Sequence, residues 1–232
     1  MNKLRTMIVA ACTLMLASMG AAQADSSNFA GPYIGLSASG YGIEAAGSSD
    51  SGAASTAVSP ITRKQDEVTI GKTAGVMGIE LGYVLPIGSA FALDVGATYV
   101  SGEAKIEHLS DDSGGRADVK FKIDDLVTWY IAPTLVLSDT GSVYIKAGLT
   151  EADTGVEGDV TTPANLSGTT WAVGTRTVLE SGIFIRTEAG YTEFNGISAQ
   201  GKGLATNPIA VTSHYSAEPT LAYGKVSLGF RF

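Results

Sequence analysis

Charged residues occur singly within the apolar segments of this sequence, and they include both acids and bases. Each falls on the side of its segment opposite to the large apolar residues. The set contains three acids and four bases: Glu80, Asp94, Lys146, Arg176, Arg186, Glu188 and Lys225. Such groups can pair in a buried interior, line a narrow pore that opens by exchanging partners, or supply a carboxylate pair for acid–base catalysis. Because buried charges are normally paired, we expect the first arrangement.

A second candidate is the motif His214-Tyr215-Ser216, since a serine beside a histidine base is what ester hydrolysis requires. The motif resembles that of the lipid A deacylase PagL family. That family has an asparagine after the serine, where this chain has Ala217, and an Asn-Pro-Gly further on that is missing here. Glu218 follows the serine too closely to orient the histidine. We therefore interpret His214 as a histidine in or next to a loop, without a catalytic role.

The first 24 residues have the pattern of a secretory signal peptide. Lys3 and Arg5 precede an apolar run, and Ala22 and Ala24 give the small-x-small pattern before Asp25. Cleavage after Ala24 predicts a single domain over residues 25–232. This mature chain has 232 − 24 = 208 residues and a formal net charge of −8 − 2 = −10.

The mature chain offers few metal ligands. Cys12, the one cysteine, lies in the leader, and His108 and His214 are the only histidines, so thiolate and paired-histidine metal sites are excluded. Acids gather in the segments that we interpret as loops: Glu44, Asp50, Glu107, Asp111, Asp112, Glu151, Asp153, Glu157 and Asp159. Their spacing lacks the Asp-x-Asp-x-Asp-Gly pattern of a calcium loop. We expect no cofactor and no metal, and the acidic balance argues against nucleic-acid binding.

The elements that must position these residues are strands with a period of two. In the segment that follows Val76, the apolar residues Met77, Ile79 and Leu81 alternate with Gly78 and Glu80. The regular segments are 77–85, 91–99, 143–150, 183–192 and 222–232, and the less regular ones are 33–41, 127–137 and 171–179. Eight strands are therefore predicted. No segment of the mature chain offers the 18 or so consecutive apolar residues of a membrane-spanning helix.

The connections between these strands alternate between short and long. The predicted tight turns are 86–89, 138–141 and 180–182, and the predicted long loops are 44–67, 102–120, 151–167 and 195–218. Residues 45–59 are almost entirely Gly, Ser, Ala and Thr, which predicts a mobile segment. Short turns on one side and long loops on the other are typical of an outer-membrane barrel.

The composition of the two faces distinguishes this barrel from a soluble one such as a lipocalin. The polar face carries mostly Gly, Ala, Ser and Thr, which suits the cramped interior of a small barrel, while the other face is almost free of charge, as lipid requires. Aromatic residues near strand ends or on the apolar face are expected to form a membrane girdle: Tyr33, Tyr41, Tyr83, Phe91, Tyr99, Trp129, Trp171, Tyr191, Phe230 and Phe232. The prediction is all-β: an eight-stranded antiparallel up-and-down transmembrane β-barrel with a polar, side-chain-filled interior.

Two segments resemble a known family. Residues 129–137, a four-residue turn and residues 142–148 are similar to the fourth and fifth strands of the small OmpX/Ail and OmpA-type outer-membrane barrels. The C-terminal residues resemble the assembly signal of outer-membrane proteins, with a final aromatic and alternate apolar positions: Val226, Leu228, Phe230 and Phe232. The resemblance implies the architecture and the bacterial outer membrane as location, and it leaves the biological role open.

The prediction for function is a non-enzymatic outer-membrane barrel with a structural or interaction role at the surface, in envelope integrity or adhesion. A narrow pore or transport barrel is the alternative, and a lipid-modifying enzyme is a more distant one. The expected partners are the lipid bilayer with its lipopolysaccharide, the barrel assembly machinery with periplasmic chaperones, and an extracellular ligand at the loops. We expect a monomer.

Overall fold

The computed structural model describes residues 25–51, 65–102, 104–107, 120–157, 165–200 and 213–232. A 3-10 helix, η1 (Ser26–Phe29), precedes the strands. The strands are β1 (Gly31–Ser51), β2 (Gln65–Ile87), β3 (Phe91–Ser101), β4 (Ala104–Glu107), β5 (Lys120–Val136), β6 (Gly141–Glu157), β7 (Leu166–Val178), β8 (Ile183–Phe194), β9 (Ile197–Gln200) and β10 (Ser213–Arg231).

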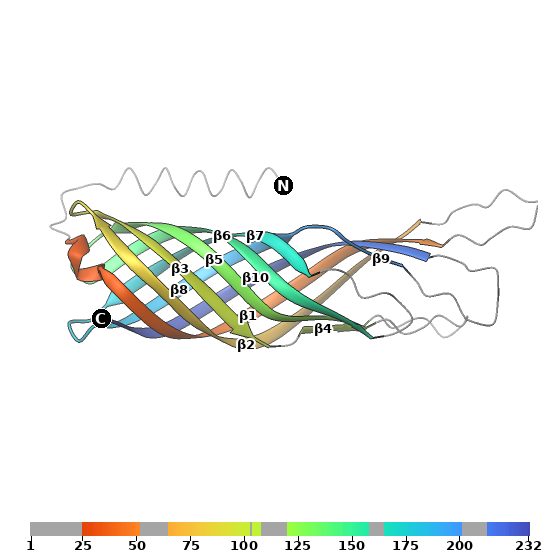
Figure 1. Ribbon diagram of the computed structural model, residues 1–232, viewed down its shortest axis with the longest axis horizontal. Helices are drawn as coiled ribbons and strands as arrows, with labels where there is room; N and C mark the ends of the chain where they lie inside the picture. Colours follow the sequence, from red (N-terminus) through yellow and green to blue (C-terminus); the bar gives the residue numbers. More distant parts are fainter. Residues whose placement is uncertain (1–24, 52–64, 103, 108–119, 158–164, 201–212) are drawn as a thin grey trace, which may run out of the picture.

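Neighbouring strands pair antiparallel in chain order, and the sheet closes on itself. The order is β1-β2-β3-β5-β6-β7-β8-β10, and β1 also pairs with β10, from Tyr33 opposite Arg231 to Ser51 opposite Ser213. The short β4 and β9 follow β3 and β8 along the chain and pair with β5 and β10. The predicted eight-stranded antiparallel barrel is confirmed (Figure 1). Closure leaves no free edge in the barrel wall.

The two ends of the barrel differ. Three short turns, η1 and the C-terminus lie together at one end, on the left in Figure 1. We call it the short-turn end, which in outer-membrane barrels faces the periplasm. At the opposite, far end, β1, β2, β5, β6 and β10 extend well beyond β3 and β7.

Several strands are longer than predicted. The expected loop 44–67 begins in β1, which continues to Ser51, and ends in β2, which starts at Gln65. The Gly- and Ser-rich residues 45–51, expected to be mobile, are therefore strand, and 52–59 lie outside the described residues. The alternating pattern marks the part of a strand that has an apolar face, and backbone pairing continues past it where both faces are polar.

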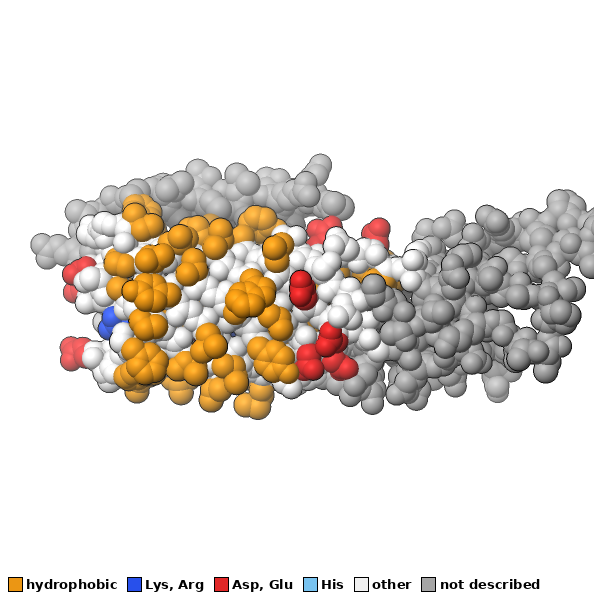
Figure 2. Space-filling model, viewed as in Figure 1, with side chains coloured by type: hydrophobic (Ala, Val, Ile, Leu, Met, Phe, Trp, Pro, Cys, Tyr) orange, Lys and Arg blue, Asp and Glu red, His pale blue; other side chains and the backbone are white. Residues whose placement is uncertain are grey.

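The lipid-facing surface carries the large apolar side chains. They form a broad band in the middle of the molecule, with acidic side chains at its far-end margin (Figure 2). Most of the predicted girdle is exposed here, but Tyr33 and Tyr41 are only 3% and 8% exposed and lie inside the barrel, so their assignment to the girdle was wrong. No helix among the described residues is long and apolar enough to cross a membrane.

Candidate functional site

Seven charged side chains meet inside the barrel, each from an alternate position of its strand that faces inward. All are at most 5% exposed. They come from β2 (Glu80), β3 (Asp94), β6 (Lys146), β7 (Arg176), β8 (Arg186 and Glu188) and β10 (Lys225). These are the residues that the alternation placed on the polar face. The sequence did not specify which acid meets which base.

Arg186 lies at the centre of the group. Its Nη2 donates to Asp94 Oδ2 at 2.9 Å, and its Nη1 lies 3.7 Å from Glu80 Oε1. Arg176 Nη2 donates to the same Asp94 Oδ2 at 3.0 Å. One carboxylate therefore serves two guanidinium groups, which belong to residues directly opposite each other on β7 and β8.

The chain of pairs continues through the two lysines. Lys225 Nζ lies 3.2 Å from Glu80 Oε2 and 3.2 Å from Glu188 Oε1, and Lys146 Nζ donates to Glu188 Oε1 at 2.9 Å. The sequence of contacts alternates in sign from one end to the other: Arg176, Asp94, Arg186, Glu80, Lys225, Glu188, Lys146. Each buried acid contacts two bases, as the high cost of an unpaired buried charge requires.

Tyrosine hydroxyls connect this chain to further strands. Tyr33 donates to Asp94 Oδ1 at 2.7 Å, and Arg186 Nη1 donates to the hydroxyls of Tyr33 and Tyr130, at 3.1 Å each. Tyr144 donates to Glu188 Oε2 at 2.8 Å. Sequence analysis did not assign these tyrosines to the site. They could have been identified from their strand positions, because each is an even number of residues from another inward-facing residue. This alternation decides the face even for an aromatic side chain.

Most interior aromatic rings lie against a glycine on the next strand. A β-carbon on Gly96 would lie 2.8 Å from the hydroxyl oxygen of Tyr130, which is too close for a real contact. The register repeats this arrangement in six cross-strand pairs: Tyr33–Gly82, Tyr130–Gly96, Tyr144–Gly174, Phe184–Gly229, Phe194–Gly168 and Tyr223–Gly190. Glycine thus makes room for large rings inside a barrel of this size.

A ladder of threonines crosses four strands on the far-end side of the charges. The hydroxyls of Thr128 and Thr150 are 2.8 Å apart, those of Thr150 and Thr170 2.5 Å, and those of Thr170 and Thr192 2.6 Å. They belong to β5, β6, β7 and β8 in turn. Each inner hydroxyl contacts one on either side, whereas the buried Thr98, opposite Thr128 on β3, has no hydrogen-bond partner among the described residues.

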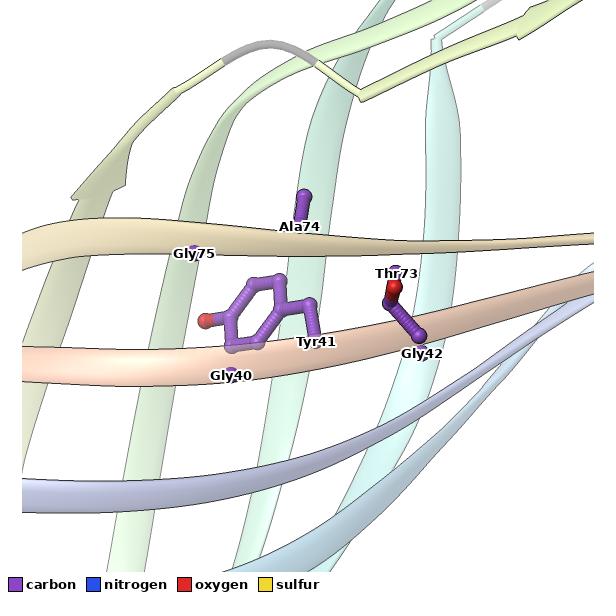
Figure 3. A pocket seen from close by; sticks show the side chains of 6 residues that line it. All are labelled: Gly40, Tyr41, Gly42, Thr73, Ala74 and Gly75. Carbon is purple, nitrogen blue, oxygen red and sulfur yellow. The ribbon is translucent and has the colours of Figure 1, made fainter.

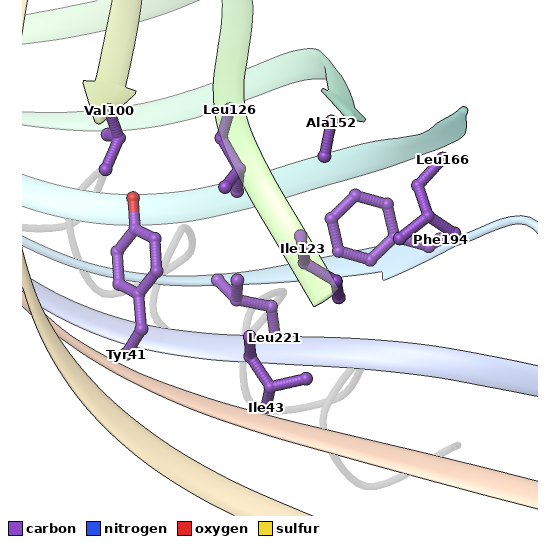
Figure 4. Close-up of a cluster of buried hydrophobic side chains, with 9 residues drawn as sticks. All are labelled: Tyr41, Ile43, Val100, Ile123, Leu126, Ala152, Leu166, Phe194 and Leu221. Atoms are coloured by element: carbon purple, nitrogen blue, oxygen red, sulfur yellow. The ribbon is translucent and has the colours of Figure 1, made fainter. Parts of the chain in front are cut away.

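Apolar clusters lie inside the barrel on both sides of the polar layers. At the short-turn end Phe29 of η1, 1% exposed, packs with Tyr33, Val84, Ala92, Val136, Val178 and Phe184. At the far end nine side chains pack together (Figure 4): Tyr41, Ile43, Val100, Ile123, Leu126, Ala152, Leu166, Phe194 and Leu221. The interior is therefore layered, with a polar middle and an apolar layer toward each end.

A shallow pocket lies between β1 and β2 (Figure 3). Gly40 and Gly75, opposite each other in register, have open space where a β-carbon would be. Both occupy outward-facing positions of their strands, as do Gly42 and Thr73. The pocket is therefore a gap between side chains on the lipid-facing surface, and it does not reach the charged interior.

The His214-Tyr215-Ser216 motif lies in β10, where His214 is paired with Asp50 of β1 and with Gln200 of β9. His214 thus lies next to the connecting segment, one residue inside β10, and the predicted loop 195–218 is shorter than expected at this end. Ser216 is exposed and makes contacts of its own.

The acids assigned to loops lie largely on strand extensions: Glu44 and Asp50 in β1, Glu107 in β4, and Glu151, Asp153 and Glu157 in β6. Asp111, Asp112 and Asp159 lie outside the described residues. Within the described part of the chain, no group of three or more His, Cys, Asp or Glu is arranged to hold a metal ion.

The C-terminal residues Val226, Leu228, Phe230 and Phe232 lie on the outer face of β10 and just after it, and all four are exposed. The rings of Phe230 and Phe232 meet edge to face, with centroids 5.2 Å apart. The backbone N–H of Phe232 donates to the carbonyl of Pro32 at 3.0 Å, which ties the last residue to β1. Ala22 and Ala24 of the predicted cleavage site lie outside the described residues.

A closed antiparallel barrel with an apolar exterior and a paired polar interior defines an integral membrane protein of the outer-membrane barrel class. Residues 9–216 match the family described as outer membrane protein beta-barrel domain, and the chain belongs to this family. It is a protein of the bacterial outer membrane and lies in the lipid bilayer, as predicted.

Solved structures of small barrels are similar in fold. The outer membrane protein OprG from Pseudomonas aeruginosa is 11% identical, with a TM-score of 0.52 and coverage of 91% of this chain and 100% of its own. The attachment invasion locus protein Ail of Yersinia pestis is 12% identical, with a TM-score of 0.40 and coverage of 85% and 99%. The outer membrane protease OmpT from Escherichia coli is 12% identical, with a TM-score of 0.45 and coverage of 87% and 97%. No curated protein matches the sequence.

Proposed function

We propose that this protein is a non-enzymatic, non-conducting barrel that holds long extracellular segments at the cell surface, where they act in envelope integrity or adhesion. The observation that carries the proposal is the filled interior. Seven charged side chains in one chain of ion pairs occupy the lumen, with an apolar layer on either side. What remains available for contact with other molecules is the far end.

Transport through the lumen would require several of these contacts to break. Arg186 alone contacts Asp94, Glu80 and the hydroxyls of Tyr33 and Tyr130. Separating one buried ion pair costs about 3–5 kcal/mol when the remaining charge finds no other partner. The apolar layers add a further barrier, because an ion crossing them would lose its water. This supports an anchoring role over a pore.

The far end carries the features expected of an interaction surface. Strand extensions such as those of β1, β2 and β10 reach beyond the apolar band, and the acids Glu44, Glu151 and Glu193 are exposed. Lipopolysaccharide is the lipid partner in this proposal. An extracellular ligand is the second partner, and the barrel assembly machinery with periplasmic chaperones delivers the barrel as a monomer. Residues 1–24 serve as the signal peptide and are removed after Ala24.

Planar-bilayer recordings of the refolded barrel test the absence of conductance. The wild type is expected to give no channel steps. The control is a triple variant, Glu80→Gln with Asp94→Asn and Arg186→Met, which removes the central charges and should admit water. Channel steps from the wild type, whether or not the control conducts, would overturn the proposal in favour of a pore.

A loop-deletion series tests the surface role. Each long segment between strands is shortened in turn, and cells are scored for adhesion to host cells and for leakage of a periplasmic marker. A loss that follows one segment, with barrel levels unchanged on a gel-mobility assay, supports the proposal. Lipid A from cells that express Ser216→Ala is the check on enzymatic activity. A change in its acyl chains relative to the wild type would contradict the non-enzymatic assignment.

A further inference from the structure

The buried charges are divided unequally between the two halves of the barrel. The N-terminal half, β1 to β5, and the C-terminal half, β6 to β10, are joined by the turn at residues 137–140. Among the buried charged side chains that the structure describes, the N-terminal half contributes Glu80 and Asp94, a charge of −2. The C-terminal half contributes Lys146, Arg176, Arg186, Glu188 and Lys225, a charge of 4 − 1 = +3.

The positive half is unfavourable on its own. Arg176 and Arg186 are directly opposite each other on β7 and β8, and like charges at such positions repel. Glu188 of the same half contacts Lys146 and Lys225, at 2.9 and 3.2 Å, and among the described residues it forms no ion pair with either arginine. The two arginines are thus compensated by an acid from the other half.

Contacts between the halves supply that compensation. Of the ion pairs among these residues, those that join the halves are Arg176–Asp94, Arg186–Asp94, Arg186–Glu80 and Lys225–Glu80, at 3.0, 2.9, 3.7 and 3.2 Å. The two pairs of Glu80 cross the β1–β10 seam, from β2 to β8 and β10, so they form only when β1 and β10 come together, while the two pairs of Asp94 cross the lumen from β3 to β7 and β8. Arg186 also reaches the Tyr33 hydroxyl on β1 across this closing seam, at 3.1 Å.

A glycine on β1 leaves room for an ion pair between the two halves at the β1–β10 seam. The pair between Lys225 of β10 and Glu80 of β2 passes over the inner face of β1, which lies between them. Gly35 of β1 is opposite Glu80, and a β-carbon there would lie 3.0 Å from Glu80 Cγ and 3.2 Å from Glu80 Oε1. The absence of a side chain at this position leaves room for the carboxylate to reach Lys225.

We propose that the interior charges are an electrostatic closing device: two half-barrels of opposite charge attract each other, and the four pairs between them form as the β1–β10 seam closes. Before closure the lumen is open to water, so the attraction acts at long range and is screened by salt. After closure the same charges are buried and fix the alignment of the halves. The acids therefore differ in role: Glu80 and Asp94 promote closure, whereas Glu188 stabilises the C-terminal half.

Refolding of the full mature chain into detergent micelles tests this division. Trp129 on β5 and Trp171 on β7 are the two tryptophans, both on the lipid-facing surface, so their fluorescence reports insertion of each half. Closure is followed by the faster migration of unboiled protein on a denaturing gel. The matched variants are Glu80→Gln, Asp94→Asn and Glu188→Gln, each of which neutralises one buried acid in an ion pair.

At low salt, Glu80→Gln and Asp94→Asn are expected to slow closure about tenfold without slowing insertion, as steering by opposite charges predicts. Glu188→Gln raises the buried charge of the C-terminal half from +3 to +4. Closure should therefore be as fast as in the wild type or faster, although the finished barrel unfolds more easily. Equal slowing by all three variants would overturn the proposal. For the wild type alone, raising the salt concentration should slow closure, and a salt-independent closing rate would overturn it even if no variant folds.

Discussion

The two faces of the same strands use side chains in different ways. On the lipid-facing surface Leu36, Leu149 and Leu228 are 59–67% exposed, and lipid can replace what a lost side chain contacted. Inside, Arg186 is 1% exposed, and each contact has a defined partner on another strand. Position within the alternation, more than residue type, therefore decides how much a substitution costs.

Deletion of Phe232 is expected to have the largest effect, and it acts through the exterior. The residue is 73% exposed, so its loss should cost the finished barrel little. The resemblance to an assembly signal predicts that the amount of protein in the outer membrane falls strongly while purified protein still refolds in detergent. Surface levels are measured by immunoblot of membrane fractions. Normal levels would contradict the assembly signal, and failure to refold would return the residue to a structural role.

Arg186→Ala should cause the largest loss of stability, about 3–5 kcal/mol, because it leaves buried acids without their central partner. Equilibrium unfolding by urea in micelles measures the loss. Arg231→Ala is the control, since that arginine lies at the short-turn end and donates to the carbonyl of Ala30. Equal effects of the two substitutions would show that the lumen is wet and its charges are unpaired.

Gly96→Ala tests the packing of aromatic rings against glycines. The new methyl group would lie 2.5 Å from the Leu81 carbonyl oxygen and 2.8 Å from the Tyr130 hydroxyl, so both the neighbouring backbone and the ring must shift, at a cost of about 1–3 kcal/mol. Gly40→Ala on the outer face has no atom within 4 Å of the new carbon and should change little. The urea concentrations at the unfolding midpoints of the two variants, measured under the same conditions, test this difference. Similar losses of stability would mean that strand propensity, and not the packing of a ring against glycine, accounts for the effect of these substitutions.

Leu36→Ala should cost about 1–2 kcal/mol, because the side chain loses its transfer from water to lipid, while lipid fills the space that it leaves and no polar group is left unpaired. The same unfolding experiment in vesicles measures it. A cost as large as that of Arg186→Ala would remove the contrast between the two faces.

The smallest effect concerns pH at the short-turn end. The backbone N–H of Ser27 donates to Asp25 Oδ1 at 2.9 Å, and this hydrogen bond holds the pKa of the exposed Asp25 carboxyl below its usual 3.8. The contribution of this cap to η1 is present above the unfolded pKa and disappears as the pH falls through the folded one. Carbon-13 NMR titration of Asp25 in the mature protein checks the direction against an unfolded peptide that begins with the same residues and has the same α-ammonium charge beside Asp25. A pKa equal to that of the peptide would mean that the cap does not form in solution.

The fold followed from sequence because lipid imposes a simple rule on one face of each strand. Segments such as 77–85 alternate so regularly that strand, face and burial are all determined. The same parity placed Lys146, Arg186 and Lys225 inside. Tyr33 and Tyr41 were misplaced because an aromatic residue suits both a girdle and the barrel interior, where Tyr33 packs against Gly82 and the Tyr41 ring lies beside that of Tyr223.

Partner identity and strand ends did not follow from sequence. The alternation along the strand shows that Asp94 faces inward. Its contact with both Arg176 and Arg186 depends on the tilt of the strands and on which side chains cross the lumen. Likewise, residues 45–51 have no apolar alternation, and their pairing with β2 and β10 is decided by the neighbouring strands. Pairing across a closed sheet is a long-range property that a local pattern does not contain.

The threonine ladder has a consequence of its own. A hydroxyl has one proton and two lone pairs, so Thr150 and Thr170 cannot donate to both neighbours, and where each uses its proton within the row, only two orientations of the row are self-consistent. Reversing one hydroxyl forces its neighbours to reverse, so the dipoles of the row switch together, as a single two-state element. Thr170→Val would cut this row into two parts that orient independently, whereas Thr128→Val would only shorten it by one member.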